Sequence, residues 1–459
     1  MHYLELTVLA DLLRRREVTS VEVTRAQLER IGCLDTRLRS YACVTSEQAL
    51  AAAEEADDEI AAGHCRGPLH GVPIGVKDLF WTQGVPTAAG GVIHRDFIPE
   101  QDATAVARLR QAGAILLGKL QMTEGAYSDH HPSIAPPVNP WNAAYWAGVS
   151  SSGAGVATAA GLCYGALASD TGGSIRWPCG ATGLTGIKPA WGRVSRYGVF
   201  EFAASLDHVG SIARSAADAA AILAVIAGPD DRDPTTLAEP LPSYVAWPDS
   251  GLRGLRIGID ERWNSEDVDS VVAGVVAEAE QVFRELGVER VPVRAPEVTR
   301  AIADWTPACA LEAAVAHQGT YPSRKSEYGA TLASHLQAGR NLSAFNYQGI
   351  RLRRMALRGR FEHLFQTIDA LLIPVQPCAP LSLHDISTLR ARPDLLLKLQ
   401  RYTVPFDLTG HPTVTLPGGL SERGLPIGLQ LAGRDESTLI RAAVEFQRTT
   451  PWHRRHPLD

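Results

Sequence analysis

Two hydrophobic periods alternate along the chain. Near the N-terminus, apolar residues recur every three or four positions after Thr7 and again after Thr19. Thr19 and Glu22 also have the spacing of a capping box, which is typical of the start of a helix. These patterns predict two successive helices, and the Ala- and Glu-rich stretch 46–62 predicts a third.

Further along, short apolar runs bounded by Gly, Pro or Asp alternate with helical patterns. Strands are predicted at 71–80, 114–118, 255–260, 288–293, 369–375 and 424–433, and helices at 103–112, 153–161, 268–286 and 437–447. Alternation of this kind favours an α/β protein.

The chain has no internal repeat and no low-complexity linker. Residues 120–153 are rich in Pro, Asn, Ser and His and are predicted to form a loop. The Asp- and Pro-rich stretch 229–250 fits either a seam between domains or a surface loop. We therefore predict one domain over 1–459, with N-terminal helices over 1–62, a core over about 67–215 and a C-terminal part over about 250–459 that completes the same fold.

Composition narrows the function. The net charge of −6 argues against a nucleic-acid-binding protein, which usually has a basic face. No signal peptide is expected at 1–16, and the longest small and apolar stretch, 154–168, is too short to span a membrane. Seven dispersed cysteines without a CxxC pair argue against disulfides and a cysteine metal site, and favour a cytoplasmic protein.

The segment ASDTGGSIRWP (168–178) is the most unusual in the chain. Two adjacent glycines before Ser174 allow successive backbone N–H groups to point into one concavity, which is the geometry of an oxyanion hole. Ser174 would then be placed to attack a carbonyl. The alternative is an ordinary glycine turn in which Ser174 caps a helix.

A second serine cluster, Ser150, Ser151 and Ser152, lies between glycines in apolar sequence. This turn and the turn that carries Ser174 are therefore expected to lie at the same pocket. No GxSxG motif surrounds any of these serines, so the nucleophile elbow of the α/β-hydrolases is absent. His130 and His131 are the most suggestive histidines, but no metal-binding spacing accompanies them, and we expect neither to be a metal ligand.

Lys77 is the candidate base because GVPIGVKDLF (71–80) is the least polar context of any lysine in the chain. Activity near neutral pH requires its pKa to fall from about 10.4 to about 7, a difference of about 4–5 kcal/mol, which buried lysines reach. The alternative is a lysine at a strand end that extends to solvent or pairs with Asp78.

These segments, together with GLTGIKPAWGRVSRYG, FAASLDHVG and GLPIGLQLAG, closely resemble the amidase signature family over nearly the whole chain. The resemblance implies a central mixed β-sheet covered by helices on both faces, with no metal and no organic cofactor. It also implies roles for three residues, with Lys77 as base, Ser150 as a bridging serine after a cis peptide bond and Ser174 as nucleophile. The backbone N–H groups of Thr171, Gly172, Gly173 and Ser174 would form the oxyanion hole.

Several positions depart from the family pattern. Val149 and Ala154 replace smaller or polar residues, and CGATGLTG (179–186) replaces a commoner sequence. None of these changes falls on Lys77, Ser150 or Ser174, so they bear on the shape of the pocket and not on the catalytic residues. Asp170 and Arg176 match positions that we interpret as structural. The loop 124–141 shapes the acyl pocket in the family, so the expected substrate contacts are Tyr127, Ser128, Asp129, His130 and His131.

The resemblance leaves two functions to separate. The first is a free-standing amidase that acts on a small-molecule amide, with a homodimer as the family expectation and no nucleic acid or membrane as partner. The second is the A subunit of a glutamine-dependent tRNA amidotransferase, which would need a partner protein to carry the tRNA. A scaffold without catalysis is disfavoured because Lys77, Ser150 and Ser174 are all present.

Overall fold

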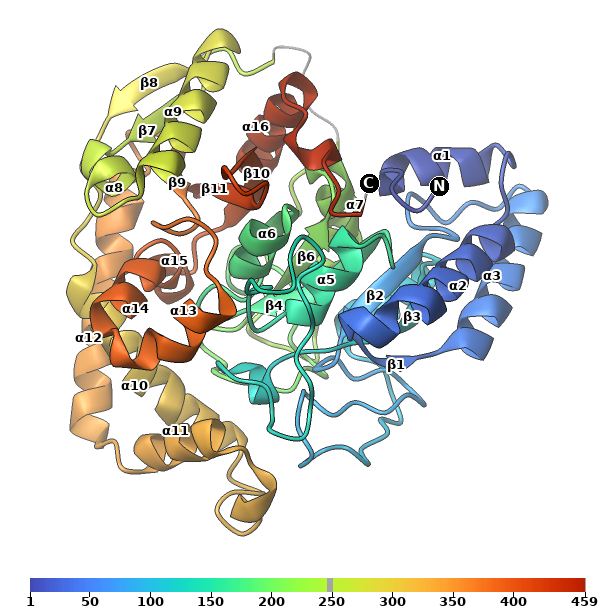
Figure 1. Ribbon diagram of the computed structural model, residues 1–459, viewed down its shortest axis with the longest axis horizontal. Coiled ribbons are helices and arrows are strands. Elements are labelled where there is room, and N and C mark those ends of the chain that lie inside the picture. Colours follow the sequence, from blue (N-terminus) through green and yellow to red (C-terminus); the bar gives the residue numbers. More distant parts are fainter. Residues whose placement is uncertain (246–250, 459) are drawn as a thin grey trace.

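The computed structural model describes residues 1–245 and 251–458. In this part of the chain eleven strands form one mixed sheet (Figure 1). In spatial order the strands are β1 (Tyr41–Val44), β3 (Ile115–Leu120), β2 (Pro73–Lys77), β4 (Gly165–Asp170), β6 (His208–Ala213), β5 (Thr185–Lys188), β10 (Thr413–Leu420), β11 (Pro426–Gly433), β9 (Ala370–Pro374), β7 (Arg256–Ile259) and β8 (Glu289–Pro292). The trios β3–β2–β4 and β9–β7–β8 are parallel, whereas the other neighbours are antiparallel.

Helices cover both faces of the sheet because the central strands are apolar on both faces. In β3, Ile115 and Leu117 belong to one buried cluster and Leu116 to the other, as the alternation of side chains along a strand requires. The first face packs against α2 (Ser20–Leu38), α3 (Ser46–Ala61), α5 (Ser152–Ala159) and α6 (Arg176–Thr182). The second packs against α7 (Ala216–Ile226), α9 (Ser270–Glu285) and α16 (Glu436–Thr449), and α1 (Leu6–Arg14) and α4 (Thr104–Gln111) pack on α7.

The remaining helices form a group on the opposite side of the molecule from α1, α2 and α3 (Figure 1). They are α8 (Glu261–Ser265), α10 (Thr299–Ala316), α11 (Ala330–Arg340), α12 (Ala344–Leu364), α13 (Leu383–Thr388), α14 (Pro393–Gln400) and α15 (Val404–Thr409). Helices α10 and α14 pack against each other, and both contribute residues to a cavity beside Ser174.

The elements predicted from hydrophobic period are confirmed, usually to within a few residues. The capping box at Thr19 and Glu22 is present at the start of α2. Residues 246–250 of the predicted seam or loop at 229–250 lie outside the described residues. Strands β6 and β7, on either side of that stretch, belong to the same sheet, so the fold is a single α/β domain as predicted.

Candidate active site

The turn that carries Ser174 connects β4 to α6, and Asp170 at the end of β4 holds it. The Asp170 carboxylate accepts hydrogen bonds from the backbone N–H of Gly173 at 2.7 Å and of Ile175 at 2.9 Å. It also forms a buried ion pair with Arg176 at 2.8 Å. Burial alone would raise the pKa of Asp170, but the adjacent Arg176 outweighs it and holds that pKa well below its usual range. The carboxylate therefore remains ionised and fixes the turn.

Glycine is required at two positions of this turn because tryptophan rings pack directly on them. A Cβ at Gly172 would lie 2.5 Å from the ring of Trp305, and one at Gly173 would lie 2.8 Å from the ring of Trp177. Gly173 also has a φ of +135°, a conformation that favours glycine. Trp305 is fixed in turn, since its indole N–H donates to the Thr171 carbonyl at 2.9 Å.

Lys77 is fully buried at the end of β2, and within residues 1–245 and 251–458 its amine is hydrogen-bonded to two hydroxyl groups. Its Nζ lies 2.8 Å from Ser150 Oγ and 2.9 Å from Ser169 Oγ. Burial lowers the pKa of Lys77 to about 7, although the more distant carboxylates of Asp170 and Asp207 oppose the shift. A large fraction of this amine is therefore neutral near pH 7. Ser169 was missed by sequence reasoning, since an isolated serine in a strand of small residues carries no signal.

The serine cluster lies against the Ser174 turn. The peptide bond between Val149 and Ser150 is cis, as the resemblance implies. The Ser151 backbone N–H donates to the Ser174 carbonyl at 3.3 Å, which joins the two loops. Ser150 is 1% exposed and Ser174 8% exposed, so only the second of these side chains reaches open space.

The backbone donors of the turn divide into two groups. The Gly173 N–H is already bonded to Asp170, so the structure differs from the expectation that all four N–H groups face a substrate. The N–H groups of Thr171, Gly172 and Ser174 make no hydrogen bond to any residue between 1 and 245 or between 251 and 458. These three N–H groups are therefore available as donors to a bound ligand.

A cavity of about 210 Å³ opens beside Ser174 and has a largely aromatic wall. Its lining residues are Ala126, Tyr127, Ser128, Asp129, Trp146, Val149, Thr171, Gly172, Ser174, Trp177, Phe202, Trp305, Thr306, Ile386, Leu389, Leu396 and Gln400. Of the five expected substrate contacts, only Tyr127, Ser128 and Asp129 line it.

The two histidines of that loop point elsewhere. His130 Nε2 lies 3.1 Å from Ser152 Oγ, and burial lowers the pKa of His130 to about 4, so its ring is neutral. His131 Nδ1 is bonded to Ser133. Neither histidine lines the cavity, so the structure does not bring these two predicted contacts to the space beside Ser174.

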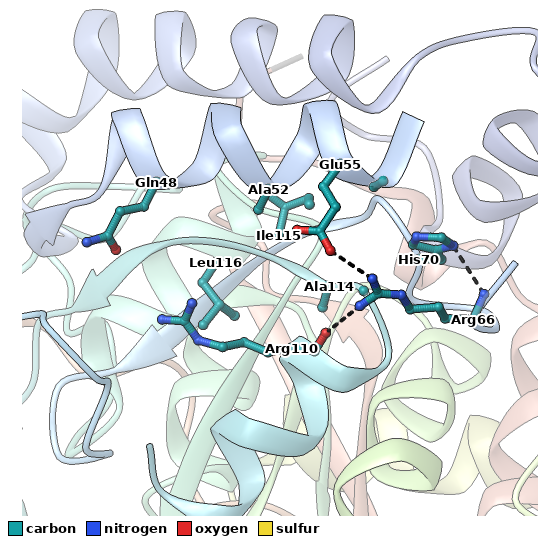
Figure 2. A pocket seen from close by; sticks show the side chains of 11 residues that line it. Gln48, Ala52, Glu55, Arg66, His70, Arg110, Ala114, Ile115 and Leu116 are labelled. Atoms are coloured by element: carbon teal, nitrogen blue, oxygen red, sulfur yellow. Dashed lines mark hydrogen bonds and ion pairs between the residues drawn. The ribbon is translucent and has the colours of Figure 1, made fainter. Parts of the chain in front are cut away.

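A second cavity, of about 270 Å³, lies between α3 and β3 (Figure 2). Figure 2 shows the Arg66 guanidinium pointing toward Glu55, with which it forms an ion pair of 2.9 Å. Arg110 is paired with Asp102 at 3.0 Å. The Arg66 N–H donates to His70 Nδ1. These charged groups have protein partners, and no serine or lysine lines the cavity, so the chemistry is not expected there.

The described residues contain neither a cluster of metal ligands nor a membrane-spanning helix. No three His, Cys, Asp or Glu side chains within 1–245 and 251–458 are grouped so that they could hold a metal ion. None of the helices in the same part of the chain is both long enough and apolar enough to cross a membrane.

Comparison with known proteins agrees with this geometry. The family model described as Amidase matches residues 22–438. AmiD of Mycobacterium tuberculosis, which is named provisionally as an amidase, is 50% identical over 458 residues, covering 99% of this chain and 96% of its own. The A subunit of the glutamyl-tRNA(Gln) amidotransferase of Geobacter metallireducens is 37% identical, covering 99% of each chain. The solved structure of the peptide amidase of Stenotrophomonas maltophilia superposes with a TM-score of 0.82 at 28% identity, covering 97% of this chain and 96% of that one.

Proposed function

Because this chain belongs to the amidase family and is therefore a hydrolase of carbon–nitrogen bonds, we propose that it cleaves a small carboxamide through an acyl-enzyme on Ser174. The observation that carries the proposal is the contact of 2.8 Å between Lys77 Nζ and Ser150 Oγ. A buried amine whose nearest partners are hydroxyl groups can accept a proton from one of them.

In the first half-reaction, Ser174 Oγ attacks the carbonyl carbon of the amide. The Ser174 proton passes to Ser150 as Ser150 gives its own proton to neutral Lys77. The oxyanion that forms is stabilised by the N–H groups of Thr171, Gly172 and Ser174. The carbon–nitrogen bond then breaks, and the proton returns from Lys77 through Ser150 to the leaving nitrogen.

In the second half-reaction, water attacks the ester carbonyl of the acyl-enzyme. Lys77 again accepts a proton through Ser150 and then returns it to Ser174 Oγ, which regenerates the free enzyme and releases the carboxylic acid. Only hydroxyl and amine protons move in this sequence, so the three side chains are sufficient for the whole cycle.

A fluorophosphonate probe tests the nucleophile before any substrate is known. We expect covalent labelling at Ser174, mapped by mass spectrometry, and loss of that labelling in Lys77→Ala. Ser152→Ala is the matched control, because Ser152 belongs to the same cluster but faces His130, and it should be labelled normally. Labelling at another serine, or equal labelling of Lys77→Ala, would contradict the triad.

A second candidate is the A subunit of a tRNA amidotransferase, favoured by the 37% identity to the Geobacter metallireducens protein over 99% of both chains. This function predicts that the chain copurifies with a second protein and hydrolyses glutamine. Purification of the chain alone in a form that releases ammonia from other carboxamides would exclude it.

A further inference from the structure

The cavity beside Ser174 has an aromatic wall that is fixed in place. Trp146 and Trp177 lie with ring centroids 6.0 Å apart at an angle of 52°. Trp305 is bonded to the Thr171 carbonyl and packs on Gly172. The Phe202 N–H donates to Asp207, which also accepts from the Thr171 hydroxyl. Because these rings are held before a ligand enters, they can pack against a planar ring without reorganising.

Another part of the lining is aliphatic, and the volume of the cavity is limited. Ile386, Leu389 and Leu396 close the cavity from the segment that contains α13 and α14. A cavity of roughly 150 Å³ lined by apolar side chains holds benzene. The volume here, about 210 Å³, therefore accommodates one ring and a short linker.

Under the proposed function, this cavity must hold the acyl group. Under the proposed mechanism the leaving amine departs first, whereas the acyl group stays attached to Ser174 until water releases it. Since Ser174 itself lines the cavity, the group bonded to its Oγ occupies this space through both half-reactions.

Gln400 is the buried polar side chain of the cavity outside the catalytic turn. It is 5% exposed and lines the cavity on the same face of α14 as Leu396, one turn earlier. Its side-chain amide makes no hydrogen bond to any residue in the described ranges. The amide nitrogen and oxygen of Gln400 are not among the fully buried, unpaired polar atoms of the described residues, so they face the open space of the cavity, where they can hydrogen-bond a ligand.

We propose that the substrate is a carboxamide whose acyl part carries a single aromatic ring on a short linker, and that Gln400 hydrogen-bonds a polar atom of the same molecule. This inference rests on the proposed function, since it identifies the acyl group that Ser174 would carry. The ring packs between the tryptophans and the aliphatic wall.

The substrate class is tested with purified enzyme and a series of amides assayed by ammonia release. We expect kcat/KM for 3-phenylpropanamide to exceed that for butanamide by about 100-fold, which is within the range for apolar pocket contacts. 3-Cyclohexylpropanamide, of similar size but not planar, should fall between them. Equal or higher kcat/KM for acetamide or butanamide, with Ser174 still labelled, would overturn the inference and leave the amidase assignment standing. Absence of both labelling and hydrolysis would instead remove the proposed function, and this inference with it.

Filling the cavity tests where the ring lies. Leu396→Trp should lower the preference for 3-phenylpropanamide over butanamide by about tenfold or more, because the new indole occupies the space for the ring. Leu397→Trp is the matched control, since the neighbouring Leu397 on the same helix is exposed and does not line the cavity. An unchanged preference in Leu396→Trp would place the ring elsewhere.

Replacing the polar group tests the role of Gln400. Gln400→Met keeps the approximate volume but removes the hydrogen-bonding atoms, and should raise KM for 3-(4-hydroxyphenyl)propanamide about tenfold while changing kcat less. KM for 3-phenylpropanamide, which has no polar atom on its ring, should change much less and serves as the control. A fall in kcat with KM unchanged, or no change in either, would show that Gln400 does not bind the substrate.

Discussion

Two lysines on neighbouring strands are equally buried but have different partners. Lys77 ends β2, and Lys119 lies on β3 opposite Val76, so one parallel strand pair carries both. They are 0% and 1% exposed. Lys119 lies 3.5 Å from the Asp78 carboxylate and also donates to the Phe80 carbonyl and the Thr87 hydroxyl. Among the residues that the structure describes, the hydrogen-bond partners of Lys77 are the hydroxyls of Ser150 and Ser169.

The partners, more than the burial, separate a base from a structural lysine. Burial lowers the pKa of both amines, to about 7 for Lys77 and about 8 for Lys119, and Asp78 opposes the shift at Lys119. Lys188 extends the comparison, because burial lowers its pKa to about 7, yet its partners are the Pro189 and His411 carbonyls. Carbonyls only accept hydrogen bonds, and the Thr87 hydroxyl beside Lys119 donates its own proton to the Val85 carbonyl. Of the three lysines, Lys77 is therefore the one whose hydroxyl partners are best placed to pass a proton onward.

Removing Lys77 should have the largest effect on catalysis. Lys77→Met eliminates the base and is expected to lower kcat/KM by about 10⁴-fold, the upper range for general base catalysis. The protein should fold, because a buried amine is replaced by an apolar side chain of similar length. Steady-state kinetics together with thermal melting would check both statements. Residual activity within tenfold of the wild type would remove Lys77 from the mechanism.

Removing Lys119 should lower the stability of the protein much more than its catalytic rate. Lys119→Met leaves the Asp78 carboxylate buried without its ion-pair partner, and is expected to lower the free energy of unfolding by about 3–5 kcal/mol. The rate per folded molecule, normalised to Ser174 labelling, should change far less than in Lys77→Met. The double variant Lys119→Met with Asp78→Asn should recover much of the stability, as measured by denaturant unfolding. A stable Lys119→Met would show that the pair is not structural.

The pH dependence distinguishes the two lysines in a different way. A base must be neutral to accept a proton, and the pKa of Lys77 is lowered to about 7. The neutral fraction therefore falls about tenfold for each pH unit below 7, so kcat/KM should rise with pH and level off above about 7. The midpoint should remain in Lys119→Met. A profile that falls with rising pH across this range would contradict a lysine base.

Features that depend on local sequence could be predicted, whereas features that depend on contacts between distant segments could not. The stretches 46–62 and 71–80 have clear periodicity and were predicted correctly as α3 and β2. Strand β4, with the sequence GALASD, lacks β-branched residues and was missed, because its pairing with β2 and β6 makes it a strand.

Some residues of the site could be predicted from local sequence, whereas others depend on tertiary packing. Lys77, Ser150 and Ser174 lie in recognisable segments, and the structure brings the first two into contact. The aromatic and aliphatic walls were missed because they depend on tertiary packing. Trp305 and Gln400 lie on α10 and α14, far along the chain from Ser174, and neither is part of a motif. The paired glycines at 172 and 173 did indicate that other groups pack closely on this turn, since glycine is often found where the backbone is closely approached.

Ser169 gives the smallest expected effect and the most specific test of the comparison. Its Oγ accepts a hydrogen bond from Lys77 Nζ at 2.9 Å and so favours the charged amine. Ser169→Ala removes that acceptor, so the pKa of Lys77 should fall further and the midpoint of the pH profile should move to lower pH. The rate at high pH should fall less than about tenfold, because Ser150 still holds the amine. Ser169→Thr keeps the hydroxyl and should leave the midpoint near its wild-type value. A midpoint that moves upward in Ser169→Ala would mean that Ser169 instead donates to Lys77 and stabilises the neutral amine.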